Sequence, residues 1–250
     1  MTEDEKLLIN RFHDLDGRAN SKYMVCYTDF LNATEYSIFL EHEGEFLCST
    51  QVFAEIEDLE RQMIAFIPDA LNFNMEYPIK LIRFRAKNKK FAQELTHRDI
   101  LGTLMGLSIE RRLIGDIITC EEACYVLVKE QFADLICNEI HRIKHTEVVA
   151  QICDSFEVEV KRKFNTKYGT VASKRLDCII SELTNGSRSQ SLKQIKEGLV
   201  FVNSRQTKYN TYSCKDGDII SVRHVGKFKI QEFGDVNKRG RIRICYDIYC

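Results

Sequence analysis

Residues 175–222 constrain the fold of this chain more than any other stretch, because signals for two helices and two strands follow one another there without a gap. Apolar side chains recur at helical spacing in residues 176–183, which predicts a short helix with one buried stripe. Asn185-Gly186 can end that helix. Ser187 and Gln190 then have the spacing of a capping box, so a second helix is predicted to start at once.

The start of this second helix favours anion binding. Leu192 and Ile195 are expected to supply its buried side, and Gly198 closes it. Arg188 lies beside the free backbone amides of the first turn, where the helix dipole also favours negative charge. The sequence therefore predicts a corner that suits a phosphate group.

Two strands follow the helix pair. Val200 and Val202 are expected to alternate between the two sides of a strand, and the turn signal Gly217-Asp218 leads into a strand at residues 219–224. This order of elements resembles the small RNA-binding domain named after ribosomal protein S-four, also called the alpha-L motif. The resemblance implies that the helix pair presents basic and polar side chains to structured RNA, at Arg175, Ser187, Arg188, Lys193, Lys196 and Asn203.

The same charged residues also have a purely structural interpretation. Arg175 and Asp177 can pair with each other, and Lys193 and Lys196 can simply solvate a helix face, because exposed charges are common on helices. For each side chain taken singly both interpretations stay open, whereas the group as a whole favours RNA contact.

Charge is distributed unevenly along the chain. Residues 172–250 contain 15 Lys and Arg against 8 Asp and Glu, a net charge of +7, whereas residues 1–171 contain 21 against 29, a net charge of −8. A basic final third is typical of a protein that binds a phosphate backbone. The acidic remainder argues against indiscriminate coating of nucleic acid.

Length and composition indicate a globular protein with two or three small domains, since the 250 residues are 44% hydrophobic and 29% charged. No apolar run approaches the roughly 20 residues of a membrane span. The acidic residues 2–5 are unlike a signal peptide, so we expect a cytoplasmic location. The ten cysteines have no framework spacing and are expected to be reduced thiols.

Residues 1–77 are expected to form an N-terminal mixed α/β domain. Helices are predicted near residues 7–12 and 33–40, and short strands at residues 46–48 and 63–66. No motif in this part carries recognisable chemistry.

Residues 78–155 show the order strand, helix, strand, strand, helix, strand, which predicts a ferredoxin-like (RRM-like) middle domain. The expected strands lie at residues 79–85, 116–119, 124–128 and 148–152, and the expected helices at residues 96–106 and 131–141. A run of basic residues starts in the first strand and is either a second RNA-facing patch or a solvated loop. It comprises Arg83, Arg85, Lys87, Lys89 and Lys90.

A basic hairpin is predicted near the end of the chain. Phe228 and Ile230 alternate with lysines, and residues 241–244 alternate Arg with Ile after a turn at residues 237–240. Its charged face either extends the RNA surface or keeps an edge ribbon solvated. The expected fold class is α+β, with residues 156–171 as linker or strand, residues 172–235 as the S-four-type domain, and residues 236–250 as the last strand of the hairpin.

One pattern imitates a zinc site. Cys120 and Cys124 with His141 and His145 have acceptable spacing within each pair for a tetrahedral ion. Cys124 falls in an apolar strand, however, and the segment between the pairs is already needed as a helix. No metal is therefore expected.

Enzyme motifs are equally weak. His97-Arg98-Asp99 imitates the kinase catalytic loop, but Leu104 stands where a magnesium-binding Asn is required. No phosphate-binding glycine loop, dinucleotide fingerprint or Gly-x-Ser-x-Gly elbow is present, so no cofactor is expected. A pseudouridine synthase, which is the alternative class, carries its S-four-type domain ahead of the catalytic domain, whereas here it comes last. A tyrosyl-tRNA synthetase would need a nucleotide-binding domain that residues 1–171 do not supply.

The stretch LTHRDILGTLMGLSIERRLIGDI at residues 95–117, together with the C-terminal region and Gly226-Lys227-Phe228, resembles the YlmH family of bacterial RNA-binding proteins. The resemblance runs nearly end to end and is weakest before residue 28, and Ser108 replaces an expected glycine. It implies a monomeric, non-enzymatic factor that binds the large ribosomal subunit with its rRNA and an obstructed peptidyl-tRNA. Such a factor supports ribosome-associated quality control by holding the tRNA, and uses no membrane and no small-molecule substrate.

The resemblance adds Lys227 to the expected RNA-binding residues and suggests a second surface on the middle domain. Within that surface, His97 and Asp99 can equally be no more than helix caps. Its expected members are His97, Arg98, Asp99, Arg111 and Arg112. An RNA-modifying enzyme stays the alternative function.

Overall fold

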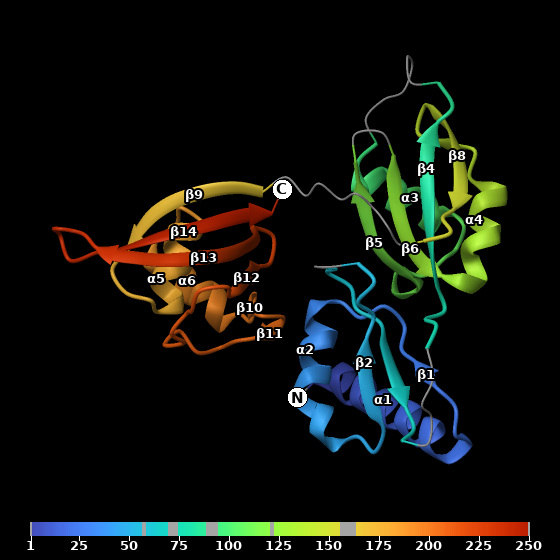
Figure 1. Ribbon diagram of the computed structural model, residues 1–250, viewed down its shortest axis with the longest axis horizontal. Coiled ribbons are helices and arrows are strands. Elements are labelled where there is room, and N and C mark those ends of the chain that lie inside the picture. The colour runs from blue at the N-terminus through green and yellow to red at the C-terminus, as the bar shows by residue number, and fades with distance from the viewer. Residues whose placement is uncertain are drawn as a thin grey trace. The chain divides into compact units, whose positions relative to one another are not determined.

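The computed structural model describes residues 2–56, 59–69, 75–88, 95–120, 123–155 and 164–249, and it divides into an N-terminal unit, Met1–Lys161, and a C-terminal unit, Arg162–Cys250 (Figure 1). The protein is an α+β chain with three antiparallel sheets. Among the described residues, no helix is both long enough and apolar enough to cross a membrane.

The N-terminal unit begins with two helices on a small sheet. Helix α1 (Glu3–Lys22) is capped by Thr2, and α2 (Ala33–His42), followed by the turn η1 (Glu43–Glu45), is capped by Asn32. The sheet has the order β1-β3-β2 and consists of β1 (Cys26–Tyr27), β2 (Ser49–Val52) and β3 (Ile64–Ile67). Their core is aromatic, built around Phe12, Phe39, Phe46 and Phe66.

The strand expected at residues 46–48 is wrong, because β2 begins only at Ser49. The backbone amides of Leu47 and Cys48 donate to the carboxylate of Asp16 in α1, at 3.0 and 2.8 Å. These amides are thus occupied by a buried helix side chain instead of a neighbouring strand. The other predicted strand of this region is confirmed as β3.

A five-stranded sheet with the order β5-β6-β4-β8-β7 forms the second half of the N-terminal unit. The expected alternation of strands and helices is present, with a short extra strand, β7. The elements are β4 (Ile79–Ala86), α3 (His97–Gly106), η3 (Arg111–Leu113), β5 (Ile114–Thr119), β6 (Cys124–Lys129), η4 (Glu130–Phe132), α4 (Ala133–Glu139), β7 (Arg142–Ile143) and β8 (Thr146–Ile152). Helix α4 is shorter than predicted, because its first turn is the 3-10 turn η4.

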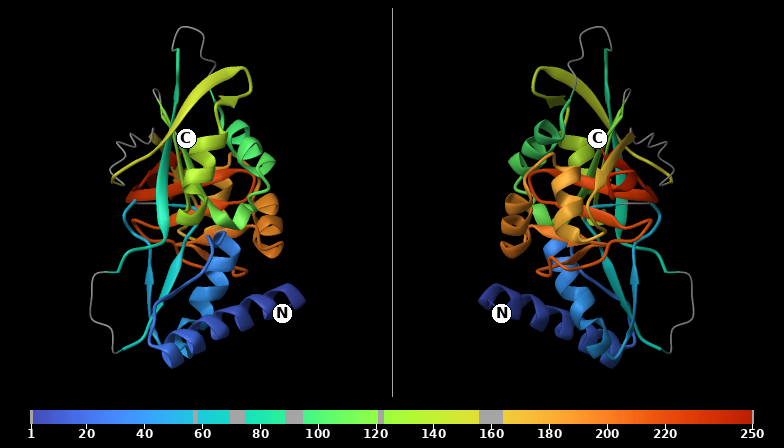
Figure 2. Two further views of the ribbon diagram at one scale, coloured as in Figure 1. Left: turned by 90° about the vertical axis from the view of Figure 1, so that its right-hand side faces the viewer. Right: turned by 90° about the vertical axis from the view of Figure 1, so that its left-hand side faces the viewer.

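The two faces of this sheet differ. Helices α3 and α4 lie on one face, where Ile100 and Ile136 join a core with Phe84 and Val126 (Figure 2). Part of the other face is covered by residues from the first half of the unit, chiefly Phe30. Gly115 makes this approach possible, because a Cβ there would lie 2.7 Å from Cε1 of Phe30 and 2.8 Å from Cβ of Leu127.

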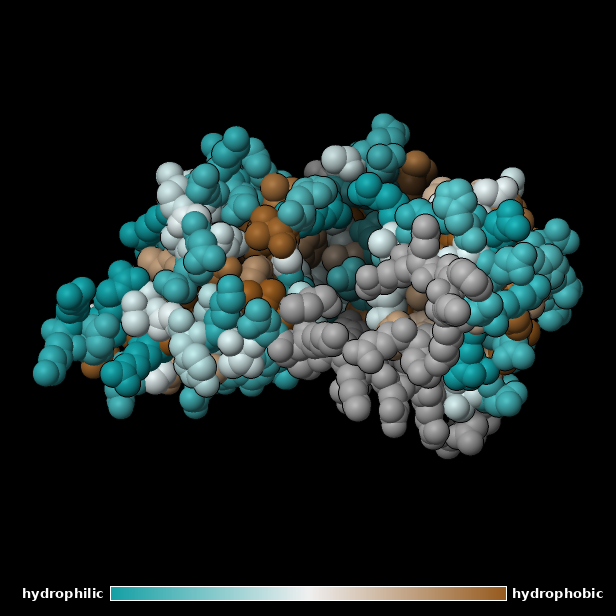
Figure 3. Space-filling view, turned by 90° about the horizontal axis from the view of Figure 1, so that it is seen from above, coloured by the Kyte–Doolittle hydropathy of each residue, from teal (hydrophilic) through white to brown (hydrophobic). Residues whose placement is uncertain are grey.

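The C-terminal unit packs two helices on one face of a six-stranded antiparallel sheet with the order β11-β10-β12-β13-β14-β9. Its strands are β9 (Phe164–Val171), β10 (Val200–Val202), β11 (Arg205–Gln206), β12 (Ile219–Val222), β13 (Gly226–Val236) and β14 (Ile242–Tyr249). Its helices are α5 (Leu176–Leu183) and α6 (Arg188–Lys196). Seen from above in Figure 3, the tip of the β13–β14 hairpin at this unit's far end is hydrophilic.

Both helices occur where the sequence predicts them, and all four apolar residues of the α5 stripe are buried. Two details differ from expectation. Leu192 is 39% exposed, and Ser191 instead joins Ile195 on the buried side of α6. Strand β10 is buried on both sides, since Phe201 lies beneath the guanidinium of Arg223, 5.7 Å from the ring centre.

Candidate nucleic-acid interface

The start of α5 and the start of α6 meet at one buried carboxylate. Asp177 has a fully buried side chain and accepts hydrogen bonds from Nε of Arg175 at 3.1 Å and from Nε of Arg188 at 2.7 Å. The two arginine side chains are 39% and 57% exposed. We call this trio the Asp177 corner. It fixes two guanidinium groups at the protein surface by their inner nitrogens.

The Asp177 corner holds its carboxylate ionised. Burial alone would raise the pKa of Asp177, but hydrogen bonds and charge attraction from Arg175 and Arg188 outweigh it and lower that pKa. A buried charge is tolerated only when it is paired in this way. The Arg175–Asp177 pair that the sequence offered as a structural alternative therefore exists, and it includes Arg188 as well.

Ser187 serves as the N-cap of α6. Its Oγ accepts from the backbone N of Gln190 at 3.2 Å, and the Gln190 side chain accepts from the backbone N of Ser187 at 2.8 Å. The predicted capping box is thus confirmed. It uses the Ser187 hydroxyl, which also lies 2.9 Å from Oγ of Ser189, so any RNA contact by Ser187 would have to be shared with the cap.

The remaining cations of α6 point to solvent. Lys193 is 74% exposed in its side chain and lies 3.8 Å from Glu197, a weak ion pair of the kind common along helices. Lys196 is also exposed. Beside the α5–α6 turn lies a hollow of about 410 Å³, with Arg188 and Arg241 among its lining residues. Its volume suits a nucleotide-sized group.

Asn203 and Lys227 do not belong to this helix surface. Asn203 has a positive φ of 49° and bridges a turn: its Nδ2 donates to Asp218 at 2.8 Å and its Oδ1 accepts from the backbone N of Ile219 at 2.9 Å. Lys227 neighbours the buried Phe228 on β13, so its side chain emerges on the sheet face opposite the helices, where it lies over the ring of Tyr249 at 4.7 Å. RNA contact by these two residues stays a prediction.

The residues predicted as a second surface are largely engaged within the N-terminal unit. Asp99 completes a capping box with Thr96 and pairs with Lys144 at 2.8 Å, so the pKa of Asp99 falls to about 2, chiefly through Lys144. The capping interpretation of Asp99 is therefore confirmed. His97 and Arg98 lie at the surface in the first turn of α3. Neighbouring protein groups partly desolvate the imidazole of His97, and this effect, followed by repulsion from Arg111, lowers the pKa of His97.

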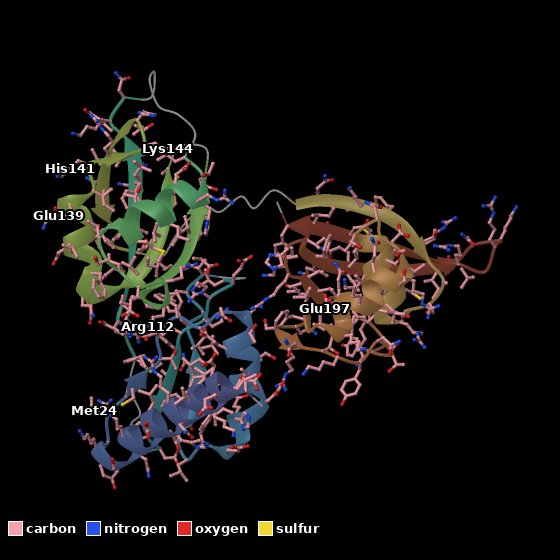
Figure 4. All side chains as sticks on the ribbon, turned by 180° about the vertical axis from the view of Figure 1, so that it is seen from behind. Met24, Arg112, Glu139, His141, Lys144 and Glu197 are labelled. Carbon is pink, nitrogen blue, oxygen red and sulfur yellow. The ribbon has the colours of Figure 1, made fainter. Side chains whose placement is uncertain are left out.

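Arg111 is partly buried, whereas the side chain of Arg112 is 47% exposed. Nη1 of Arg111 donates to the backbone oxygens of Ile114 and Gly115 at 2.5 and 3.1 Å, and burial, followed by repulsion from Arg61, lowers the pKa of Arg111 to about 10. Arg112 pairs with Glu110 through Nε at 2.7 Å. Figure 4 shows Arg112 where the first half of the N-terminal unit approaches the five-stranded sheet, with Lys144 on another part of that unit.

Arg112 also belongs to a cluster that the sequence did not reveal. Asp29, with a 7% exposed side chain, is within ion-pair distance of Arg11 at 2.5 Å, Arg112 at 2.7 Å and Lys129 at 2.5 Å. We call these four residues the Asp29 cluster. Its members come from α1, the loop after β1, η3 and β6, and no sequence spacing brings such distant positions together.

Other patterns noted in the sequence supply no site in the described ranges. Cys124 is buried on β6, and the nine cysteines placed by the structure are free thiols. Within those ranges no group of three or more His, Cys, Asp or Glu residues could hold a metal ion.

Comparison with known proteins agrees with the resemblance found in the sequence. A family model described as "Putative RNA-binding domain in YlmH" matches residues 73–157. The ribosome-associated protein quality control protein P2 of Bacillus subtilis (strain 168) is 24% identical over 246 residues, which cover 98% of this chain and 95% of that protein. Residues 73–157 therefore resemble the RNA-binding domain of the YlmH family. The family's RNA-binding domain model spans the whole five-stranded sheet, and the B. subtilis homologue spans both units.

A solved structure shares part of this fold. The cell division protein ylmH from Streptococcus pneumoniae superposes with a TM-score of 0.50 and 22% sequence identity, over 61% of this chain and 93% of that chain. At this identity the likeness concerns the fold alone.

Proposed function

We propose that this protein is an RNA-binding factor that engages the large ribosomal subunit, through rRNA and peptidyl-tRNA, in ribosome-associated quality control of stalled translation. The role named for the B. subtilis homologue, ribosome-associated protein quality control, supports the process, and the YlmH RNA-binding domain model supports RNA as the ligand. The observation that carries the proposal is the Asp177 corner, where two arginines are held at the surface next to a capped helix start.

The proposed RNA surface consists of the Asp177 corner and the lysines of α6. Arg188 donates to Asp177 through Nε, and Arg175 donates through Nε and, at 3.4 Å, through Nη2. The other N–H groups of the two guanidinium groups can contact a phosphate, and Lys193 and Lys196 add exposed charges nearby. Contacts of this kind position a protein on folded RNA by backbone shape instead of by sequence. Ser187, Asn203 and Lys227 are proposed as peripheral contacts, and the five residues of the second surface as a further ribosome contact.

The finer fold assignment belongs to the same proposal. Residues 78–155 would be a ferredoxin-like domain, since the strand order places the first and third strands, β4 and β6, in the centre of the sheet. Residues 172–235 would be an S-four-type domain. The strand β9 pairs with β14 over eight residues, so both strands that flank this region would extend its sheet. We further propose a cytoplasmic monomer that holds the tRNA without catalysis.

Sedimentation with purified large subunits tests this function. Wild-type protein should sediment with subunits that carry peptidyl-tRNA, and higher salt should release it. The double variant Arg188→Ala and Lys193→Ala should bind less tightly, with the slope of log affinity against log salt reduced by up to about 2. Arg142→Ala is the matched control, because Arg142 is a 66% exposed cation elsewhere on the surface.

Two results would overturn the proposal. One is wild-type protein that fails to bind large subunits at moderate salt. The other is a chemically altered nucleotide in RNA recovered after incubation, detected by mass spectrometry of nucleosides, since that outcome would establish an RNA-modifying enzyme.

A further inference from the structure

The described residues cover only part of the five-stranded sheet's face that lies away from α3 and α4. Side chains alternate along each strand, so Leu81 and Leu127 share this face with Arg83 and Tyr125. Leu81 and Leu127 are buried in the core that Phe30 and its neighbours build. Beyond them the same face carries polar and aromatic groups. Figure 1 looks onto this face, with α3 behind the sheet.

Three side chains form a continuous row across the part that the described residues leave uncovered. In the strand register, Arg83 of β4 lies directly opposite Tyr125 of β6 on one side and Gln151 of β8 on the other. Nη2 of Arg83 donates to Oε1 of Gln151 at 2.9 Å. Tyr125 is partly buried against the adjoining core and Gln151 is exposed. We call Tyr125, Arg83 and Gln151 the open row.

The open row is bordered by positive charge and by a hollow. Arg85 follows on the same side of β4, opposite Val149, which is 40% exposed. Lys87 continues the alternation, and its side chain is exposed. A hollow of about 470 Å³ involves both faces beside β8: Arg83 and Gln151 line it from the open row, Cys137, Ala150 and Ile152 from the helix side, and Asp154 is the one acidic residue among its described lining residues.

Arg83 is incompletely satisfied by the protein. Its Nε is buried and has no hydrogen-bond partner in the described part of the chain. Most buried polar atoms in folded proteins do have partners, so an unpaired one is notable. Gln151 fixes the guanidinium plane beside Tyr125, which keeps a planar cation and an aromatic ring next to each other on one sheet surface.

We propose that the open row binds an unpaired segment of RNA. The Tyr125 ring stacks on one base, the Arg83 guanidinium stacks on or hydrogen-bonds to its neighbour, and the Gln151 amide contacts a base edge. Arg85 and Lys87 hold the phosphates that follow. This inference rests on the proposed function and deepens it, because it assigns single-stranded RNA to the N-terminal unit and structured RNA to the Asp177 corner.

The chemistry favours unpaired RNA over the other polymers that a sheet face can bind. Bases of a duplex are stacked on each other and hidden from a flat protein surface, whereas unpaired bases can spread onto aromatic rings and guanidinium planes. A protein partner would be expected to cover a larger apolar area than Val149 provides on this face. The cations in line along β4 match a phosphate chain.

Binding of two RNA probes to the full-length protein tests the proposal. Fluorescence anisotropy should be measured with a labelled oligouridine and with a blunt RNA duplex. Tyr125→Ala should weaken oligouridine binding by at least about fivefold, the size expected for one stacked base. Tyr125→Phe keeps the ring and should bind like wild type. Neither variant should change duplex binding, which Arg188→Ala with Lys193→Ala should weaken.

A second variant at the surface is needed because Tyr125 is partly buried and Tyr125→Ala can lower thermal stability. Arg85→Ala removes an exposed cation and should reduce the salt slope of oligouridine binding. The control Arg18→Ala, which removes an exposed cation of α1, should leave that slope unchanged. Equal oligouridine affinity for wild type, Tyr125→Ala and Arg85→Ala would overturn the inference. If the variants keep their oligouridine affinity but wild-type protein still sediments with large subunits, the inference about the open row fails and the proposed ribosomal function stands. If Tyr125→Ala weakens oligouridine binding but wild-type protein does not sediment with large subunits, the inference about the open row stands and the proposed ribosomal function fails.

Discussion

Two buried aspartates hold clusters of cations in the two units, yet they join very different parts of the chain. Asp177 links the starts of two consecutive helices, and its partner Arg188 lies only 11 residues away. Asp29 links segments far apart, since Arg112 lies 83 residues away. The first arrangement is local and shapes a surface. The second is long-range and holds two sheets of one unit together.

The two clusters overlap in exposure and differ more in how many cations hold the carboxylate. At the Asp177 corner two arginines, with side chains 39% and 57% exposed, donate to the aspartate. In the Asp29 cluster three cations surround the aspartate: Arg11 and Arg112 are each 47% exposed, and Lys129 is 19% exposed. Arg112 also pairs with Glu110. We infer that Asp29 contributes mainly to stability, whereas Asp177 contributes mainly to the arrangement of groups for a ligand.

The largest effect is expected when Asp29 is removed. Asp29→Ala would leave three cations close together with no buried partner, and breaking a buried ion pair costs about 3–5 kcal/mol. Hydrogen exchange of amides in β3 and β6 should show this loss for the N-terminal unit, while amides of β12 and β13 in the C-terminal unit keep their protection. Glu110→Ala, which removes a 62% exposed partner of Arg112, is the control and should cost much less. Equal costs for the two variants would remove the distinction between the clusters.

The next effect concerns RNA affinity and has an unexpected sign. Asp177→Asn removes a negative charge from a basic surface, so simple charge counting predicts tighter RNA binding. If Asp177 instead arranges Arg175 and Arg188, affinity should fall, because the guanidinium groups lose their fixed position before binding. Duplex binding at constant salt measures this change.

Glu197→Gln is the matched control for Asp177→Asn. Glu197 lies 3.8 Å from Lys193 on the same surface and has no arginine to position, so its neutralisation should leave affinity unchanged or raise it. Tighter binding by both variants would show that Asp177 acts only through its charge.

The sequence predicts the local features around the Asp177 corner but does not predict the Asp29 cluster. The α5 stripe, the Ser187–Gln190 box and the Thr96–Asp99 box depend on residues at most a few positions apart, and all are confirmed. The Arg175–Asp177 pair, one of the two interpretations that the sequence leaves open, also exists. The Asp29 cluster depends on how two sheets meet, and helical or strand periodicity carries no information about that contact.

Strand register sets the second limit of prediction. Alternation places Arg83 on one side of β4, but its position opposite both Tyr125 and Gln151 depends on the pairing of β4 with β6 and β8. The strand expected at residues 46–48 failed for a related reason. A buried carboxylate on α1 takes the amides of Leu47 and Cys48, and a distant side chain of this kind is invisible to local patterns.

The smallest expected effect is a shared response to acid. Burial alone would raise the pKa of Asp29, but Lys129 and Arg11 lower it, and Lys144 brings the pKa of Asp99 to about 2. A carboxyl group whose pKa is lower in the folded state stabilises that state above the unfolded pKa of about 3.9, and this contribution disappears as the pH falls through the folded value. The N-terminal unit should therefore lose stability between about pH 5 and pH 2.

Urea unfolding across this pH range tests whether a carboxylate held by one cation behaves like one held by three. Asp99 and Asp29 are almost equally buried, with side chains 9% and 7% exposed. Asp99→Asn should flatten the acid loss only slightly, because Asp99 is joined to one half-exposed lysine whose attraction is screened by water. Asp29→Asn should flatten it more, since three cations surround its carboxylate. If the two variants flattened the acid loss equally, the number of surrounding cations would not set the response to acid, and the Asp29 cluster would stabilise its unit no more than a single ion pair does.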